Sequence, residues 1–580
     1  MKFSSPQQTP PMDSLGKISR PTISQRAIVI LLLFWMGANM LSALAHKSIT
    51  TDEIIHIPAG YYHLFAGNYT INNEHPPLVK MIAALPMLFV QPDEPPLHPL
   101  EQLESHIRTD EAYAAFWTAN AARFETICFW ARVPMVLLTL ALGWLIFVFA
   151  NEMGNARAGV LAVALFAFEP TILAHGRIVH TDVPAALAYL LFVFALLRYW
   201  QTPSTRTAWQ AGFLTGIALI TKFSLIIVGP LLAAAVIFVW IKRPAGRGQI
   251  LRHALLAALL ILLVINLAYR FDHGALLHSD VTWIATKTPG QFQQATDVIN
   301  FFAAILPTYF LYGIYNVTIH NHFGHPAALL GQYSDFGWWY YFPVAFALKT
   351  SLPFLLVTIS ALLWAIWCLS VRSDRRLIFL LAPLAAYTAL CLTSGINIGV
   401  RHFLPAFPFL FLLGGLMLDA ILRGPTGRVF RMGAVALLVG AMAFEAVRVY
   451  PDYIPYVNQL RGAKQGWELL SDSNVEWGDD VKAMSLYLRA KGETKVSAAL
   501  AAGWLTTRFY GLEYIDLCSL PADRAPETKH VAIGASFLNG STVPGSDKLI
   551  GDMRQDLFAA YRTRMPEAIF GNSIFLYRVK

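Results

Sequence analysis

Acidic side chains beside long apolar runs are the residues of this sequence whose type and spacing could do chemistry. Asp52 and Glu53 directly follow the first long apolar run. Charged groups are costly close to lipid, so two adjacent carboxylates at such a boundary indicate a function. A carboxylate there can take a proton from a hydroxyl group, and we predict both residues as catalytic. A solvated loop start is the alternative interpretation, and the pair alone does not exclude it.

A second charged segment spans residues 73–80 and reads Asn-Glu-His-Pro-Pro-Leu-Val-Lys. Its two prolines fix the backbone, so the preceding Glu74 and His75 are held in an extended geometry. We predict His75 and Lys80 as substrate-binding residues. Paired prolines also begin ordinary interfacial helices, and that interpretation stays open.

Further charges stand at the ends of apolar runs. Asp182 begins one run, and Arg177 lies five residues before it. Lys222 interrupts another apolar stretch, and Arg401 opens a third. We predict Asp182 as catalytic and the three cations as binding residues, because a ring of cations suits a phosphate whose lipid tail stays in the bilayer. A structural ion pair between Arg177 and Asp182 is an equally good interpretation of those two residues.

Histidines gather in a later segment that is rich in aromatic residues, at His320, His322 and His325. His322 together with Glu74 could hold a divalent metal ion, the one cofactor that the sequence indicates. Histidines that make ordinary hydrogen bonds are the simpler interpretation, because the spacing differs from that of structural metal sites.

The composition places these residues in a membrane protein. The chain has 580 residues, of which 56% are hydrophobic and 14% charged, and its mean hydropathy is +0.49. Soluble chains carry about 25% charged residues. The net charge of +8 does not indicate nucleic acid as a partner, because Lys and Arg collect in loops that would face the cytoplasm. The four cysteines do not form a disulfide framework.

A membrane span needs roughly 17–25 apolar residues, and the apolar runs predict an α-helical polytopic protein with about 11–13 transmembrane helices. Lys and Arg recur in alternate loops, which puts the N-terminus in the cytoplasm and the candidate site outside. The Ala43–Ala45 sequence also resembles a signal-peptidase site, but the polar tail before a long run favours an uncleaved anchor. The eleven runs lie near 27–45, 127–150, 157–174, 181–198, 208–222, 224–241, 251–268, 341–369, 377–394, 402–422 and 430–448.

The chain divides into three predicted parts. Residues 1–26 form a cytoplasmic tail, and residues 27–450 form the membrane domain. Two long loops of the membrane domain, 46–126 and 270–340, lie outside. Residues 451–580 form a small extracytoplasmic α/β domain, in which strand-like runs alternate with polar helices. These runs are Lys495–Ala501, His530–Ala535 and Ser573–Val579.

The motifs above resemble a known family. Asp52-Glu53 followed by His75–Lys80 is similar to the first-loop signature of protein O-mannosyltransferases and their bacterial relatives, including the aminoarabinose transferases. The resemblance covers most of the chain and implies a GT-C fold and a glycosyltransferase that uses a polyprenyl-phosphate sugar. Further strings similar to bacterial phospholipid-carrier-dependent glycosyltransferases are Gly337–Phe346, Lys349-Thr350, Arg401–Pro405 and Asp472–Gly478.

The resemblance also implies roles for particular residues. Asp52 matches the family acid that acts as catalytic base, and Asp182 matches the acid of the second outer loop. Arg177 matches a cation that would hold the carrier phosphate. Glu74 stands where the aminoarabinose branch has a metal-binding Glu, whereas His75 replaces the Lys of that branch and agrees with the mannosyltransferase branch. This difference leaves the sugar and the metal open.

The implied reaction is a single displacement. An acceptor hydroxyl attacks the anomeric carbon while the polyprenyl phosphate leaves, which inverts the sugar. The expected partners are a polyprenyl-phosphate sugar donor, membrane lipids and a protein, lipid or glycan acceptor, and the expected location is a bacterial inner membrane. The sequence identifies neither the sugar nor the acceptor. No Asp-x-Asp triplet of nucleotide-sugar enzymes and no phosphate-binding glycine loop occurs in the sequence.

Two other functions are alternatives to a glycosyltransferase. A transporter or flippase for a lipid-linked sugar would carry its charges near the bilayer midplane on broken helices. The charges of this sequence gather instead at the outer ends of the runs, which favours an enzyme. A non-enzymatic assembly or sensor subunit would not explain why Asp52, Glu74 and Asp182 all fall on one predicted side.

Overall fold

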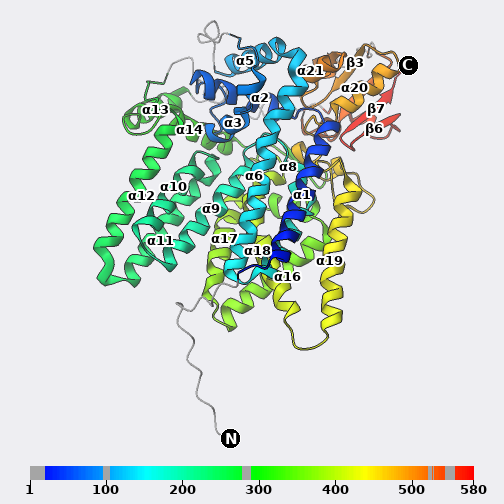
Figure 1. Ribbon diagram of the computed structural model, residues 1–580. Helices are drawn as coiled ribbons and strands as arrows, with labels where there is room; N and C mark the ends of the chain where they lie inside the picture. Colours follow the sequence, from blue (N-terminus) through cyan, green and yellow to red (C-terminus); the bar gives the residue numbers. More distant parts are fainter. Residues whose placement is uncertain are drawn as a thin grey trace.

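A bundle of helices joined to a small β-sheet makes up the molecule (Figure 1). The computed structural model describes residues 20–95, 105–276, 289–519, 526, 528–542 and 556–579. Most of the N-terminal tail expected over residues 1–26 lies outside these ranges. The predicted class, an α-helical polytopic membrane protein with a small C-terminal α/β domain, is confirmed.

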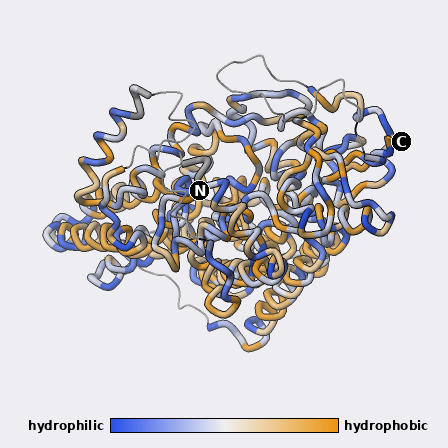
Figure 2. The backbone as a smooth tube through the Cα atoms, turned by 90° about the horizontal axis from the view of Figure 1, so that it is seen from above, coloured by the Kyte–Doolittle hydropathy of each residue, from blue (hydrophilic) through white to orange (hydrophobic). Residues whose placement is uncertain are grey.

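Long apolar helices form the bundle. Among the described residues, nine are long and apolar enough to cross a membrane. In the view from above, these hydrophobic helices lie side by side in a broad layer (Figure 2). In four of them, α6, α11, α17 and α18, the span begins in the 3-10 turn just before the helix. The helices are α1 (Ile23–His46), α6 (Phe124–Met153), α9 (Asp182–Gln201), α11 (Val228–Lys242), α12 (Arg247–Ala268), α16 (Leu352–Val371), α17 (Ile378–Leu392), α18 (Phe407–Leu422) and α19 (Arg428–Val449).

The remaining predicted runs correspond to shorter helices. Run 208–222 is α10 (Thr205–Leu219), and run 157–174 is divided into α7 (Ala156–Ala167) and α8 (Pro170–His175). Run 341–369 is divided into α15 (Tyr341–Lys349) and α16. Both divisions fall just before a proline, which has no N–H to continue a helix and therefore suits the first turn of a new one.

Helix α18 is the centre of the bundle, and its residues Phe407–Asp419 are all buried. It packs against α7 and α16, and α7 packs in turn against α6 and α1. Gly415 permits a close approach, because a Cβ atom there would lie 2.6 Å from the carbonyl oxygen of Ala158 in α7. Small residues at helix crossings are the usual way to bring membrane helices together.

Short helices cover one end of the bundle, the upper end in Figure 1. They connect the long helices where the predicted outer loops lie. The segment from the end of α3 through α4 exposes Leu85, Leu88 and Phe89, which suits a helix that lies at a membrane interface. These helices are α2 (Thr51–Tyr61), α3 (Pro77–Ala84), α4 (Met87–Val90), α5 (Ser105–Ala119), α13 (Pro289–Phe302) and α14 (Thr308–Phe323).

The C-terminal part contains a five-stranded mixed sheet at the same end (Figure 1). The strand order is β4-β3-β5-β7-β6, with β3 parallel to β4 and β5, and β7 antiparallel to β5 and β6. Helix α20 (Val481–Ala490) packs into the same core. The three predicted strands are confirmed, and the short β4 and β6 were missed. The strands are β3 (Lys495–Ala499), β4 (Glu513–Asp516), β5 (His530–Gly534), β6 (Ala568–Phe570) and β7 (Ile574–Arg578).

A small hairpin completes the described strands. β1 (Ala327–Leu329) and β2 (Gln332–Ser334) pair antiparallel. Leu329 also forms a bridge with Leu470. The hairpin therefore joins the outer segment after α14 to the segment that follows the last long helix.

Candidate active site

A cavity of 540 Å³ lies at the covered end of the bundle. Apolar side chains from α14, α17 and the 3-10 turn before α11 (Phe223–Ile227) form part of its wall. Five of the residues predicted from the sequence as site residues line it together: Asp52, Glu74, His75, Lys222 and Arg401. The other five, Glu53, Lys80, Arg177, Asp182 and His322, are not among its lining residues.

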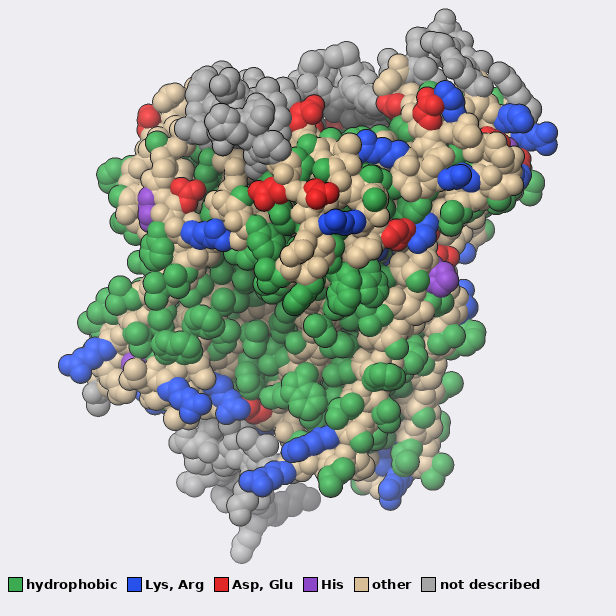
Figure 3. Space-filling model, turned by 45° about the horizontal axis from the view of Figure 1, so that its top comes forward, with side chains coloured by type: hydrophobic (Ala, Val, Ile, Leu, Met, Phe, Trp, Pro, Cys, Tyr) green, Lys and Arg blue, Asp and Glu red, His purple; other side chains and the backbone are tan. Residues whose placement is uncertain are grey.

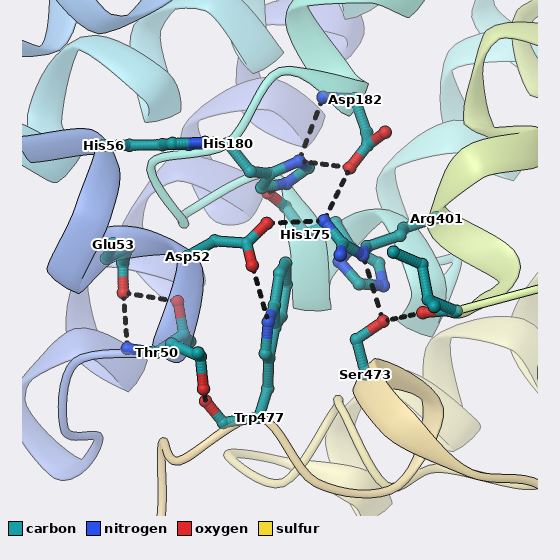
Figure 4. A network of polar contacts seen from close by, with 12 residues as sticks. Thr50, Asp52, Glu53, His56, His175, His180, Asp182, Arg401, Ser473 and Trp477 are labelled. Atoms are coloured by element: carbon teal, nitrogen blue, oxygen red, sulfur yellow. Dashed lines mark hydrogen bonds and ion pairs between the residues drawn. The ribbon is translucent and has the colours of Figure 1, made fainter. Parts of the chain in front are cut away.

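Asp52 lies in the first turn of α2, and its side chain is 20% exposed. Its Oδ2 atom accepts a hydrogen bond of 2.7 Å from Nη1 of Arg401. Its Oδ1 atom accepts a bond of 3.3 Å from Nε1 of Trp477 (Figure 4). Burial raises the pKa of Asp52, but the charges of Arg401 and His56 and the hydrogen bond from Arg401 together bring the pKa below its ordinary value. Asp52 is therefore an ionised carboxylate with an exposed edge on the cavity.

Arg401 joins Asp52 to the second predicted acid, Asp182. Its Nη1 atom lies 3.4 Å from Oδ2 of Asp182. The other oxygen of Asp182 pairs with Lys222, and Nδ1 of His180 lies 2.8 Å from Oδ2. Asp182 starts α9 and is fully buried. Arg401 and Lys222 compensate its charge. The two acids and two cations form one network, in which Asp52 and the cations border the cavity.

The segment before α3 is held in place by Lys80. Its Nζ atom donates to the carbonyl oxygens of Asn72, at 2.6 Å, and His75, at 2.8 Å. The Lys80 side chain is fully buried. Burial is also the main reason why the pKa of Lys80 is well below its ordinary value, although the Glu74 charge opposes the shift. Lys80 thus positions Glu74 and His75 on the cavity wall from behind.

Glu53 faces away from the cavity into the protein. It is fully buried and forms an ion pair with Arg132, with 2.6 Å between Oε2 and Nη2. It also accepts backbone hydrogen bonds from Val179, at 3.0 Å, and Thr50, at 2.9 Å. Burial raises the pKa of Glu53, but Arg132 and these bonds bring it below the ordinary value. Glu53 therefore fixes the start of α2. Its catalytic role stays a prediction, and its position away from the cavity does not add support to it.

Arg177 lies between the bundle and the C-terminal part. Its Nη2 atom donates to the carbonyl oxygen of Pro451 at 3.3 Å and lies 3.9 Å from Oδ2 of Asp479. The guanidinium also stands over the ring of Tyr453, 5.8 Å from its centre. Arg177 is 1% exposed. Its predicted role in phosphate binding stays a prediction.

The two predicted metal ligands, Glu74 and His322, differ in their surroundings. Glu74 lies 3.8 Å from Nδ1 of His320, and Nε2 of His320 lies 3.2 Å from Nδ1 of His325. His322, in contrast, is exposed and stacks edge-on against Phe323. Within the described ranges, no group of three or more His, Cys, Asp or Glu side chains is arranged to hold a metal ion. Of the two predicted ligands, Glu74 thus lies beside a histidine of the cavity wall, His320.

Sequence reasoning missed two residues of the site. His56 lines the cavity one helical turn after Asp52, and its Nδ1–H donates to the carbonyl oxygen of Val179 at 3.2 Å. Burial lowers the pKa of His56 to about 4, so this ring is neutral at pH 7. Its spacing of four residues from Asp52 on one helix face could have indicated it. Trp477 was quoted only within a family string, and nothing local marked it as a partner of Asp52.

Comparison with known families adds an independent observation. Residues 116–269 match the family model described as dolichyl-phosphate-mannose-protein mannosyltransferase. This segment is similar to that family. It runs from the end of α5 to the end of α12 and contains Arg177, Asp182 and Lys222, so the resemblance inferred from the motifs is confirmed. The predicted enzyme class, glycosyltransferase, is confirmed with it. No protein of curated function matches the sequence.

Solved structures with a related arrangement have low sequence identity. One is the archaeal oligosaccharyltransferase AglB from Archaeoglobus fulgidus with an inhibitory peptide and a dolichol-phosphate, at 9% identity and a TM-score of 0.47. The superposition covers 88% of this chain and 69% of that one. Another is ArnT from Cupriavidus metallidurans bound to undecaprenyl phosphate, at 13% identity and a TM-score of 0.45, covering 94% of this chain and 97% of that one.

Proposed function

We propose that this membrane glycosyltransferase moves a sugar from a polyprenyl-phosphate carrier to an acceptor hydroxyl, with Asp52 as the general base. The observation that carries the proposal is the position of Asp52, ionised and partly exposed, on a cavity that Arg401 and Lys222 also line. A base and two cations beside one space are what a displacement with a phosphate leaving group requires.

The base is suited to its task by geometry. The carboxylate of Asp52 takes the proton of the acceptor hydroxyl while the hydroxyl oxygen forms its bond to the anomeric carbon. The bond from that carbon to the phosphate oxygen breaks in the same step, and the phosphate leaves with its electron pair. Attack from the face opposite the leaving group inverts the sugar. General-base catalysis of this kind contributes roughly 10²–10⁴-fold to the rate.

The cations are suited to the leaving group. Arg401 and Lys222 both pair with Asp182 and both line the cavity. A phosphate that enters the cavity would share these two cations with Asp182, and the negative charge that develops on it as it leaves would be stabilised. Apolar residues of the same cavity, among them Ile226, Ile314 and Leu390, suit the first part of a polyprenyl chain.

We place the cavity on the outer face of a bacterial inner membrane and the N-terminus in the cytoplasm. Helix α9 carries Asp182 at its start and Arg198 in its last turn. Cations likewise follow α11, α16 and α18, at the end of the bundle away from the cavity. Figure 3 shows a hydrophobic band with acidic and basic side chains mixed above it and Lys and Arg prevailing below. Loops rich in Lys and Arg stay in the cytoplasm.

A divalent metal ion remains compatible with this proposal. Glu74 and His320 would hold it, since both line the cavity and lie 3.8 Å apart. A metal there would supply positive charge for the carrier phosphate. In this proposal Asp52 takes the proton, and Arg401 and Trp477 orient Asp52, whether or not a metal ion is bound.

A transporter of lipid-linked sugars is the second candidate, and the position of the charges disfavours it. Asp52, Asp182 and Arg401 each stand in the first turn of a helix at the covered end of the bundle. Transporter sites are typically formed by interrupted helices near the bilayer midplane.

The decisive experiment is transfer by the purified chain from a panel of labelled polyprenyl-phosphate sugars to protein, lipid and glycan acceptors, followed by mass spectrometry of the products. We expect one donor to be consumed, with a product of inverted anomeric configuration. Retention of configuration would contradict the single displacement. Movement of intact donor across the vesicle membrane without transfer would favour the transporter.

A further inference from the structure

The segment Ser473–Asp480, here called the tail loop, leaves the C-terminal part and lies against the start of α2 (Figure 4). The backbone N–H of Thr51 donates to the carbonyl oxygen of Trp477 at 2.9 Å, and the N–H of Ser48 donates to that of Asp479 at 2.7 Å. The first N–H groups of a helix have no partner within the helix. The tail loop therefore satisfies the donors that immediately precede Asp52.

Trp477 contacts both members of the ion pair on the cavity wall. Its Nε1–H donates to Oδ1 of Asp52 at 3.3 Å, while Oδ2 of Asp52 accepts from Arg401. The centre of its ring lies 4.4 Å from Cζ of Arg401, the geometry of a cation–π contact. The rings of His175 and His180 pack on Trp477, each 5.7 Å away. These contacts fix the position of the indole, and its N–H points at Asp52.

Ser473 holds the other side of Arg401. Its hydroxyl oxygen accepts a hydrogen bond of 3.0 Å from Nε of Arg401, and the hydroxyl donates to the carbonyl oxygen of Ile398. Glycine at position 399 allows Ser473 to come this close to Arg401. Gly399 has a φ of +136°, and a Cβ atom there would collide with the Ser473 hydroxyl. The guanidinium is thus fixed between the tail loop and the two acids.

The tail loop is anchored by contacts that do not involve the cavity. Nζ of Lys349 donates to the carbonyl oxygen of Asn474 at 2.6 Å, and Oδ1 of Asn474 accepts from the N–H of Val400 at 2.9 Å. Trp477 is 3% exposed and Asn474 is fully buried. A buried segment held by several hydrogen bonds has little freedom to move, so it can impose a geometry on the side chains that it contacts.

We propose that the tail loop completes the active site, with Trp477 as the positioning residue of Asp52 and Ser473 as that of Arg401. The role of these positions in turnover rests on the function proposed above, whereas the contacts themselves do not. Other titratable groups face Asp52 as well: His56 on its own helix, Asp182 on α9, and Asp472 just before the tail loop. Trp477 differs from them because it fixes the orientation of the carboxylate through a hydrogen bond to Oδ1.

A matched pair of tryptophan variants tests the proposal. Trp477→Phe keeps a ring over Arg401 and removes the N–H donor. Trp467→Phe makes the same change in the preceding segment, where the indole N–H donates to the neutral amide of Gln465 at 3.2 Å. The first measurement is the infrared carboxylate band of Asp52, isolated by subtracting the spectrum of Asp52→Asn. This band shifts when a hydrogen-bond donor is lost, and it requires no substrate.

We expect the Asp52 band to shift in Trp477→Phe and to stay in place in Trp467→Phe. We also expect kcat of Trp477→Phe to fall about tenfold, the effect of one weak hydrogen bond to a charged group, with little change in donor KM. An unshifted band in folded Trp477→Phe overturns the proposal whatever the activity. Absence of transfer by the wild type overturns the proposed function instead, while the band still decides on Trp477.

Ser473→Ala keeps the proposal falsifiable if the Trp477 variants do not fold. This change is small and leaves the Asn474 anchor intact. Because Arg401 loses a partner on Nε, we expect kcat to fall severalfold and the Asp52 band to shift through the altered ion pair. A folded Ser473→Ala variant with the wild-type band and wild-type kcat contradicts the proposal.

Discussion

Arg401 and Asp52 are separated by 349 positions in the sequence, yet Nη1 of Arg401 lies 2.7 Å from Oδ2 of Asp52. The same Nη1 atom lies 3.4 Å from Oδ2 of Asp182. One guanidinium therefore holds two acids from different parts of the chain at the wall of one cavity. The stability of this arrangement and the chemistry of Asp52 both depend on it, which leads to the following predictions.

Replacing Asp52 removes the proposed base. In Asp52→Asn we expect the rate of transfer from a labelled polyprenyl-phosphate sugar to fall by roughly 10²–10⁴-fold. Asp374→Asn is the matched control, because Asp374 pairs with Arg376 in the loop between α16 and α17, away from the cavity. Wild-type transfer by Asp52→Asn would exclude Asp52 as the base.

Replacing Arg401 changes the pH dependence of transfer. Arg401 makes the largest of the contributions that lower the pKa of Asp52 against the opposing effect of burial. In Arg401→Gln the effect of burial remains while the largest lowering contribution is lost, so the pKa of Asp52 rises. The base form is lost as the pH falls through this raised pKa. We expect the rate profile of the variant to decline on the acid side at a pH where the wild type is still flat.

The control for this profile is Arg376→Gln, which removes an exposed guanidinium from the Asp374 pair. Its profile should coincide with that of the wild type. A declining acid limb at the same pH in wild type and Arg401→Gln would show that Asp52 is not the titrating group.

Lys80 is predicted to act through structure. Lys80→Met leaves the carbonyl oxygens of Asn72 and His75 without their buried donor, which costs about 1–3 kcal/mol for such a group. We expect a lower thermal unfolding temperature in detergent together with a higher donor KM, because Glu74 and His75 lose their position. Lys242→Met, at an exposed cation in the last turn of α11, should change neither. A raised KM at an unchanged unfolding temperature would favour direct substrate binding by Lys80.

Asp479 makes the stability of the protein depend on pH. Burial, and next the neighbouring Asp480, raise the pKa of Asp479 to about 6. The folded state therefore binds a proton more tightly than the unfolded state, whose pKa is about 3.9. This contribution to stability is complete below about pH 4 and is lost as the pH rises through about 6.

The measurement is the thermal unfolding temperature of the wild type and of Asp479→Asn between those two pH values. We expect the wild type to lose stability over this window relative to the variant. Asp556→Asn, which removes a surface pair with Arg562 at 2.7 Å, serves as the control. Parallel curves for the wild type and Asp479→Asn would contradict the assignment.

Much of the fold could be predicted from local sequence. Apolar runs such as 251–268 and 430–448 correspond to α12 and α19, because a run of that length can span the bilayer, where the chain must satisfy its backbone hydrogen bonds internally by forming a helix. The strands over Lys495–Ala499 and His530–Gly534 were visible in the same way, from short buried runs between polar segments. The divisions at Pro170 and Pro353 were not predicted, since a long run contains no sign of how its two parts will pack.

The sequence by itself determined which residues carry charge beside lipid. Asp52, Glu74, Asp182 and Arg401 stand out because ionisable groups at the ends of apolar runs are rare and costly. Only the tertiary structure decided how they divide the work. Glu53 is adjacent to Asp52 but points to Arg132, since successive residues of a helix face different directions. Trp477 reaches Asp52 across 425 positions, and such a contact depends on the packing of the tail loop, which no local pattern encodes.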